Sequence, residues 1–102
     1  MTEAGQAPEP SAEPYRLVFT AAAKRALAQH LPEKVAAAAL EFIAGPLAAQ
    51  PYRVGKRLLL PPHEGTWSAR RGTYRILYEV DDDERTVRVT AVDHRADVYR
   101  SR

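Results

Sequence analysis

The stretch GTWSARRGTYRILYEVDDD, Gly65–Asp83, decides the fold of this chain. Apolar and polar residues alternate on both sides of Arg71-Gly72, which predicts two antiparallel strands joined by a tight turn, since glycine accepts left-handed backbone cheaply. Arg70 and Arg75 would project from one face of this hairpin, because successive side chains of a strand point to opposite faces. The other face would be apolar, with Trp67, Ala69, Tyr74, Ile76, Tyr78 and Val80. A sheet with one apolar and one cationic face suits the binding of a phosphate chain.

Further strands flank the hairpin. A second turn at Asp81–Glu84 leads into Thr86–Val92, whose alternation predicts the next antiparallel strand. Upstream, Leu58–Leu60 precedes Pro61-Pro62 and is predicted as an edge strand, because proline cannot donate to a central ladder. Tyr15–Phe19 has the composition of a short strand.

Two helices are predicted between the first strand and the hairpin. Thr20 is a good N-cap for a helix over Ala21–His30, with a narrow apolar stripe. Pro32 suits the start of a second, alanine-rich helix over Glu33–Ile43, and Gly45-Pro46 should end or kink it. An amphipathic pair of this kind is also found in partner-binding or membrane helices, but its polar faces are not strongly basic, which favours core packing on a sheet.

The predicted fold class is α+β, with an N-terminal strand and a helical hairpin packed on a three- to four-stranded antiparallel sheet. Residues 1–14 contain proline and glutamate and almost no large apolar side chains, which predicts a disordered tail. Residues 15–102 would then form a single domain. The chain has no run of about 18 apolar residues and no signal-peptide pattern, so neither a transmembrane helix nor a secretory signal is expected. The absence of cysteine fits a cytoplasmic location, since the cytoplasm is reducing.

The charge of the chain is small in sum but uneven in distribution. The net charge is +2, yet the segment from Arg53 to Arg75 holds six Lys and Arg residues and a single acid, Glu64. Such a basic stripe is typical of a polyanion partner. The alternative is that these side chains only solvate an exposed sheet.

Common catalytic motifs are absent. The sequence has no glycine-rich phosphate loop, no HExxH, no GxSxG and no cysteine, so a thiol nucleophile and a thiolate metal site are excluded. The histidines His30, His63 and His94 are scattered, and we expect neither a metal site nor a cofactor.

What remains is a set of residues near strand ends: Arg70, Arg75, His94, Arg95 and Tyr99. These residue types suit RNA cleavage by the RNA's own 2′-hydroxyl, because arginine neutralises the charge that develops on the phosphate. Tyrosine can stack on a splayed base, and histidine can transfer a proton near neutral pH. Taken singly, each residue has an ordinary structural explanation.

Two longer motifs carry a resemblance. RRGTYRILYEVDDD and the ending VTAVDHRADVYR, together with VGKRLL and GTWSAR upstream, resemble the RelE/ParE superfamily of bacterial toxins from toxin–antitoxin operons, on its RelE side. The resemblance covers roughly residues 15–100. It implies a small sheet wrapped on a helical hairpin and a ribosome-dependent endoribonuclease that cuts translated mRNA in the A site. It also implies a cognate, acidic antitoxin of the RelB/Phd-like kind.

The resemblance further implies residue roles. Arg75 matches the family arginine that stabilises the transition state, Arg95 the arginine that protonates the leaving oxygen or holds the phosphate, and Tyr99 the tyrosine that orients the substrate. Where some members have two lysines, this chain has Ser68 and Arg70, so Arg70 is expected to grip phosphate, because a guanidinium rarely gives up a proton.

His94 is then a candidate base or acid, brought beside Arg70 and Arg75 by strand pairing. Lys56, Arg57, Arg71 and Ser68 are expected to bind RNA. Two alternatives stay open: a ParE-like toxin that inhibits gyrase, and a catalytically inactive RNA-binding relative.

Overall fold

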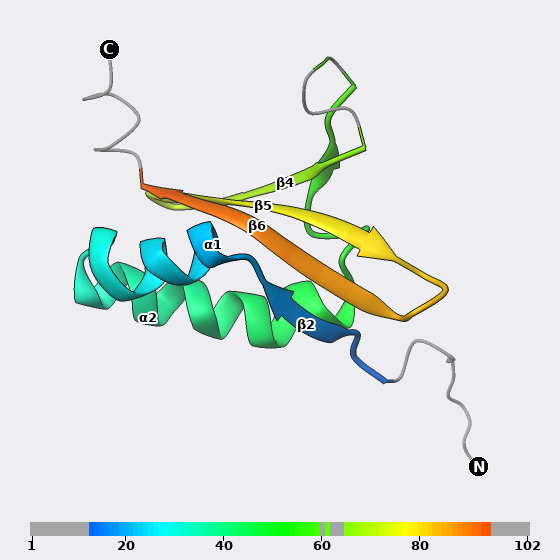
Figure 1. The fold of residues 1–102 in the computed structure, drawn as a ribbon, viewed down its shortest axis with the longest axis horizontal. Helices are drawn as coiled ribbons and strands as arrows, with labels where there is room; N and C mark the ends of the chain where they lie inside the picture. The colour runs from blue at the N-terminus through cyan, green and yellow to red at the C-terminus, as the bar shows by residue number, and fades with distance from the viewer. Residues whose placement is uncertain (1–12, 60, 62–64, 95–102) are drawn as a thin grey trace.

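The computed structural model describes residues 13–59, 61 and 65–94. Within these ranges, helices pack on one face of a five-stranded sheet whose strand order is β2-β6-β5-β4-β3. Figure 1 shows the two layers, with the helices along one side of the sheet. The predicted α+β class is confirmed.

The hairpin at the centre of the sheet is formed by β4 (Trp67–Arg71) and β5 (Tyr74–Asp81). Its loop is Gly72-Thr73, and Gly72 has a φ of 57°. Glycine at the first central position of a two-residue hairpin loop fits the right-handed twist of the flanking strands. The turn therefore lies one residue later than predicted, so that Arg71 is the last residue of β4.

The last strand, β6 (Thr86–His94), pairs antiparallel with β5 on one side. On its other side it pairs in parallel with β2 (Arg16–Phe19). The predicted N-terminal strand is thus part of the sheet, which makes the sheet mixed rather than antiparallel throughout. A parallel partner is possible here because the helices between β2 and the hairpin carry the chain back across the sheet.

The edge strand β3 (Lys56–Arg57) lies upstream of its predicted position at Leu58–Leu60. It pairs with β4, and the Leu58 N–H then donates to the carbonyl of Thr66 at 2.8 Å. The ladder starts directly after Gly55, where a Cβ would lie 2.3 Å from the Tyr78 hydroxyl and 2.8 Å from the Ser68 carbonyl. Only glycine permits this close approach of the backbone just before the strand.

The first helical segment consists of α1 (Ala21–Arg25) and the π-helical turn η2 (Ala26–His30). The Thr20 hydroxyl accepts a hydrogen bond from the Ala23 N–H at 3.2 Å, so the predicted N-cap is confirmed. This bond satisfies one of the N–H groups that a helix start leaves without a partner.

The second helical segment consists of α2 (Glu33–Phe42) and the π-helical turn η3 (Ile43–Leu47), with Pro32 as the N-cap residue. Gly45-Pro46 does not end this helix, because Pro46 lies inside η3 and helical backbone continues through Ala49. A π-helical turn can take up a residue that has no N–H to donate.

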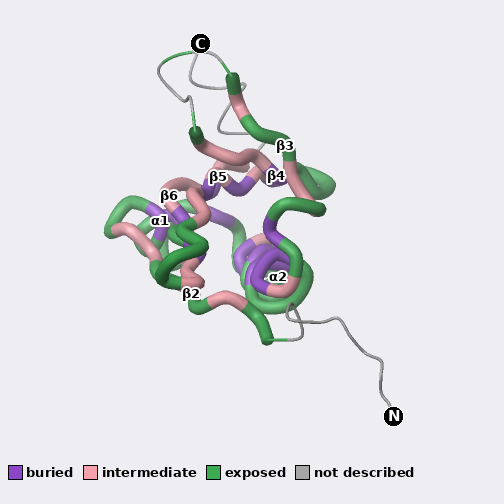
Figure 2. The backbone as a smooth tube through the Cα atoms, turned by 90° about the vertical axis from the view of Figure 1, so that its right-hand side faces the viewer, coloured by how far each residue is buried: buried purple, intermediate pink, exposed green. Residues whose placement is uncertain are grey.

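The core lies between the helices and the facing side of the sheet. Figure 2 shows buried residues both in the strands of the sheet and in α2, which lie across from one another. Ala23 and Ala39 are fully buried, so the alanine-rich faces pack in the core as predicted. The largest side chains buried there are Ile43, Leu47, Ile76, Tyr78, Val87 and Val89. None of the helices in the described ranges is long and apolar enough to span a membrane.

Candidate functional site

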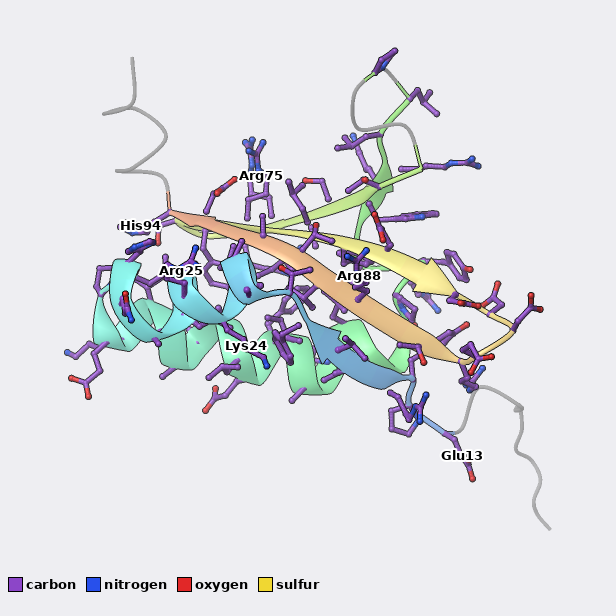
Figure 3. All side chains as sticks on the ribbon, in the orientation of Figure 1. Glu13, Lys24, Arg25, Arg75, Arg88 and His94 are labelled. Atoms are coloured by element: carbon purple, nitrogen blue, oxygen red, sulfur yellow. The ribbon has the colours of Figure 1, made fainter. Side chains whose placement is uncertain are left out.

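The face of the sheet opposite the helices, here called the open face, carries a row of three charged residues. Arg70 of β4 pairs in register with Arg75 of β5, and Arg75 pairs with Asp93 of β6. Residues directly opposite one another in antiparallel strands have Cβ atoms about 4.5–5.5 Å apart and share a face. The row therefore places two guanidinium groups and one carboxylate side by side, and Figure 3 shows Arg75 projecting away from the helices.

Arg75 and Asp93 form an ion pair. The Arg75 Nη2 donates to Asp93 Oδ2 at 3.0 Å, and the two side chains are 38% and 36% exposed. The Arg75 Nε–H is buried and has no acceptor among the described residues. A guanidinium has five N–H donors, so this single contact leaves most of its donor capacity for another anion.

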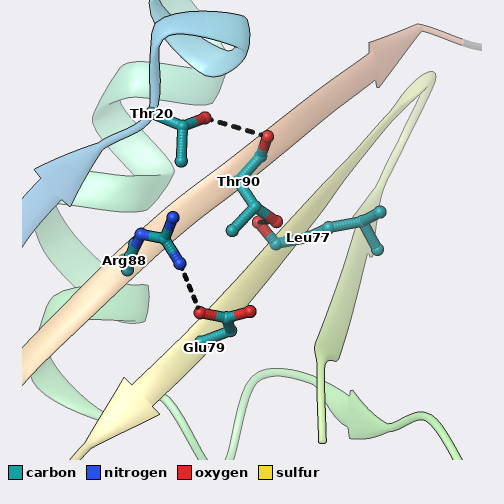
Figure 4. Close-up of polar contacts among 5 residues, drawn as sticks. All are labelled: Thr20, Leu77, Glu79, Arg88 and Thr90. Carbon is teal, nitrogen blue, oxygen red and sulfur yellow. Dashed lines mark hydrogen bonds and ion pairs between the residues drawn. The ribbon is translucent and has the colours of Figure 1, made fainter. Parts of the chain in front are cut away.

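The row depends on an irregularity in the pairing of β5 with β6. Leu77 pairs with Ala91 and Tyr78 with Val89, so Thr90 is an extra residue in β6. The Thr90 hydroxyl donates to the Leu77 carbonyl at 3.2 Å, and the Thr20 hydroxyl donates to the Thr90 carbonyl at 3.1 Å (Figure 4). Hydrogen bonds to β5 and to the N-cap residue of α1 therefore both stabilise the β-bulge.

This bulge decides which side chains of β6 reach the open face. With regular pairing, Arg75 would lie opposite Val92, and His94 would share the face of Arg75. A one-residue bulge exchanges the two faces beyond it. Asp93 consequently lies beside Arg75, and His94 pairs with Tyr74 on the face that carries the helices.

The sequence predicted that strand pairing brings His94 beside Arg70 and Arg75. The structure instead places His94 on the opposite face of the sheet. Tyr74 marks the face of His94, since it is buried and its ring lies 6.5 Å from that of Phe42 in α2. Figure 3 shows His94 at the end of β6, on the side of the helices, with Arg75 on the other side of the sheet. The expectation failed because it assumed a regular strand.

The other residues expected to bind RNA divide between the two faces. Ser68 pairs with Leu77, and Lys56 pairs with Ser68, so both belong to the open face next to the charged row. Arg57 pairs with Trp67 and is exposed at the sheet edge.

Arg71 lies with the helices rather than with Arg70 and Arg75. Its guanidinium carbon is 4.6 Å from the centre of the Phe42 ring, and Nη2 is 3.4 Å from the Val54 carbonyl oxygen. A cation over an aromatic face is a stabilising contact. Arg95 and Tyr99 lie outside the described residues.

The opposite end of the sheet is acidic. A groove of about 730 Å³ at the β5–β6 turn is lined by five carboxylates, two arginines and three other residues: Glu79, Asp81, Asp82, Asp83, Glu84, Arg16, Arg88, Val18, Val80 and Thr86. Glu79 accepts a hydrogen bond from Arg88 at 2.8 Å on the open face. A polyanion is repelled by this end and attracted to the end that carries Arg70 and Arg75.

Two tyrosines tie the acidic turn to the rest of the fold. The hydroxyls of Tyr15 and Tyr52 donate to the two carboxylate oxygens of Asp82 at 2.7 and 2.6 Å. The bonds from Tyr52 and Tyr15 lower the pKa of Asp82 below its ordinary value. Partial burial and the bond to Asp82 raise the pKa of Tyr52 to about 12. The cluster joins the β5–β6 turn to the segment before β2 and the loop after η3.

No set of three or more His, Cys, Asp and Glu residues in the described ranges is arranged to hold a metal ion. The described residues of the open face at the charged row and beside it carry guanidinium groups, the Asp93 carboxylate, the Ser68 hydroxyl and the Lys56 ammonium.

The model of the ParE toxin of the type II toxin–antitoxin system parDE matches residues 17–99. The chain belongs to this toxin family. Toxin RelG of Mycobacterium tuberculosis is 52% identical over 87 residues, which are 85% of this chain and 98% of that protein. Toxin RelE of the same organism is 47% identical over 87 residues, with 85% and 88% covered.

Solved structures agree with this assignment. The chain has a TM-score of 0.76 and 51% identity to a chain of the toxin–antitoxin complex RelBE2 from M. tuberculosis, covering 81% of this chain and 93% of that one. The isolated Escherichia coli RelE toxin shares the fold, with a TM-score of 0.64 at 22% identity and coverage of 85% and 93%. The resemblance that the motifs indicated is confirmed, and the chain is a RelE-like toxin of a type II toxin–antitoxin system.

Proposed function

We propose that this toxin is a metal-independent endoribonuclease that cleaves mRNA in the ribosomal A site and thereby stops translation and growth. The observation that carries the proposal is the cross-strand pair of Arg70 and Arg75 on the open face. Like charges directly opposite one another destabilise a sheet. Asp93 offsets one of the two charges, and a bound phosphate would offset the other.

The reaction suits such a site. The RNA 2′-oxygen attacks the adjacent phosphorus, the bond from phosphorus to the 5′-oxygen breaks, and a 2′,3′-cyclic phosphate and a 5′-hydroxyl result. The proton leaves the 2′-hydroxyl, and another is taken up by the 5′-oxygen. Negative charge builds up on the phosphate oxygens in between, where the guanidinium groups of Arg75 and Arg70 stabilise it by paired N–H bonds.

Further residues complete the proposal. Arg95 would protonate the leaving oxygen or hold the phosphate, and Tyr99 would stack on a base near the cleaved bond. Ser68 and Lys56 extend the open face along the RNA backbone. Lys56 and Arg57, on the edge strand, would also contact ribosomal RNA, and Arg71 would bind RNA from the side of the sheet that carries the helices. A toxin that acts on ribosomes works in the cytoplasm.

A cognate antitoxin is part of the proposal. RelBE2 of M. tuberculosis, the 51%-identical structure, is by its name a toxin–antitoxin complex. An antitoxin for this chain would present acidic residues to Arg70 and Arg75. It would also cover apolar side chains of the helical layer, such as Leu40, which is 45% exposed.

Primer extension on a translated message, after induction of the toxin, tests the activity. Wild type should cut within the reading frame, and Arg75→Ala should abolish the cuts. Arg88→Ala is the matched control, because Arg88 is an ion-paired arginine of the same face at the other end of the sheet. The family model is named for ParE, so gyrase inhibition is the competing function; intact mRNA together with DNA damage would support it.

A further inference from the structure

The described residues offer few groups that can take the proton of the 2′-hydroxyl. Arg70 and Arg75 do not act as bases, because a guanidinium keeps its proton. His94 lies on the other face, and Lys56 is on the edge strand, two strands away from Arg75. Asp93 is the carboxylate in the row of Arg70 and Arg75.

The contacts of Asp93 leave it able to accept a proton. Its Oδ2 accepts the bond from Arg75 Nη2, while Oδ1 has no partner among the described residues. More than a third of the side chain is exposed. A phosphate bound to the same guanidinium would be an immediate neighbour of the Asp93 carboxylate, which would bring the adjacent 2′-hydroxyl within reach of Oδ1.

We propose that Asp93 is the general base of the cleavage, an inference that rests on the proposed endoribonuclease activity. Asp93 Oδ1 removes the proton of the 2′-hydroxyl as the 2′-oxygen bonds to phosphorus and the bond to the 5′-oxygen breaks. The 5′-oxygen takes up a proton from solvent, and Asp93 returns its proton to solvent. Arg75 holds both the phosphate and the base in one arrangement.

A general base and a purely structural residue at position 93 predict different behaviour. A carboxylate next to the site repels the RNA backbone, so its removal should tighten binding of the ribosome–mRNA complex. If Asp93 is the base, its removal should also slow the reaction. Asparagine keeps the size of aspartate and its side-chain oxygen can still accept the bond from Arg75. Asp93→Asn therefore removes the base and retains the partner of Arg75.

The test measures single-turnover cleavage of A-site mRNA on programmed ribosomes. Asp93→Asn should lower the saturating rate by about 10²–10⁴-fold, the usual contribution of a general base. The toxin concentration that gives half the saturating rate should stay the same or fall. Asp93→Glu should keep part of the rate. Glu79→Gln is the matched control, because Glu79 is the other ion-paired carboxylate of the open face, and its rate should equal that of wild type.

The pH dependence separates a base from a positioning residue. Without its base the variant depends on hydroxide, so the Asp93→Asn rate should rise about tenfold per pH unit between about pH 7 and 8.5, more steeply than wild type. Within the described ranges, the charged groups facing Asp93 are Arg75 of β5 and, one strand further, Arg70 of β4. Lys24, Arg25 and His30 belong to the helical layer on the other face.

The outcomes are distinct. A wild-type rate for Asp93→Asn, or a slow rate whose pH dependence parallels that of wild type, would overturn the assignment while leaving the nuclease intact. A wild-type toxin that does not cut mRNA at all would overturn the proposed function, and the role of Asp93 with it. Thermal unfolding of each variant shows whether a loss of activity comes from a loss of folded protein.

Discussion

Thr20 and Thr90 are 70 residues apart in the chain, and the hydroxyl of Thr20 donates a hydrogen bond of 3.1 Å to the carbonyl of Thr90. The same hydroxyl accepts the capping bond from the Ala23 N–H. The Thr20 side chain thus caps the N-terminus of α1 and also stabilises the bulge in β6. Because the bulge turns Asp93 toward Arg75, the site on the open face depends on a residue of the opposite layer.

Thr20→Val should destabilise the fold by about 1–2 kcal/mol, because the cap and the bulge lose their bonds while the side chain keeps its shape. Urea denaturation measures the free energy of unfolding. Thr20→Ser, which keeps the hydroxyl, is the matched control and should stay close to wild type. A Thr20→Val variant as stable as wild type, or a loss in Thr20→Ser as large as in Thr20→Val, would contradict this role of the hydroxyl.

Substitution by alanine at two glycines should change the free energy of unfolding in opposite directions. A Cβ at Gly55 would meet the Tyr78 hydroxyl and the Ser68 carbonyl, whereas a Cβ at Gly45 has nothing within 4 Å. Gly55→Ala should cost about 1–3 kcal/mol through overpacking. Gly45→Ala, inside η3, should stabilise by about 0.4–1 kcal/mol, because alanine loses less backbone entropy in a helix. The free energies of unfolding of the two variants decide this, and a neutral Gly55→Ala would contradict the close approach.

The Asp82 cluster should make stability sensitive to acid. Hydrogen bonds from Tyr52 and Tyr15 lower the pKa of Asp82 from its ordinary 3.8. A carboxylate with a lowered pKa in the folded state contributes stability above its unfolded pKa, and that contribution is lost as the pH falls through the folded value. The melting temperature of Asp82→Asn should therefore fall less than that of wild type when the pH drops below about 4.

Asp83→Asn is the control for this measurement, since the Asp83 side chain makes no hydrogen bond within the described ranges. It should follow the wild-type curve. If Asp82→Asn and Asp83→Asn respond alike to acid, the tyrosine bonds do not set the acid sensitivity.

Binding to ribosomes should weaken with salt, because contacts to phosphates release counterions. Arg70→Ala should reduce the slope of log K against log salt by about 1, the loss of one phosphate contact. Arg88→Ala should leave the slope unchanged, since Arg88 lies at the acidic end and is paired with Glu79. A slope that is the same for wild type and Arg70→Ala would remove Arg70 from the RNA-binding face.

Local rules predicted much of this fold from the sequence. The alternation in residues 67–80 gave the central hairpin, and the hydroxyl before Ala21 gave the first N-cap, since both signals lie within a few residues of their effect. The position of the edge strand could not be predicted locally, because it follows Gly55, where a side chain would collide with Tyr78 and Ser68 of other strands.

The bulge at Thr90 has no local signal, because it depends on Thr20 and on the carbonyl of Leu77. Sequence reasoning therefore selected His94 and missed Asp93, although the two are neighbours. The signal that could have found Asp93 is its charge: a carboxylate in β6 near the register of an arginine in β5 is a cross-strand partner. Only the irregular register shows which of the two neighbours faces Arg75.

The most direct test of the account compares two neighbouring substitutions, Asp93→Asn and His94→Gln, in the same single-turnover cleavage of A-site mRNA. The bulge places Asp93 beside Arg75 and His94 on the helix-covered face. We expect Asp93→Asn to lose about 10²-fold or more of the rate and His94→Gln to cut nearly as fast as wild type. The reverse result, a slow His94→Gln and a fast Asp93→Asn, would contradict it.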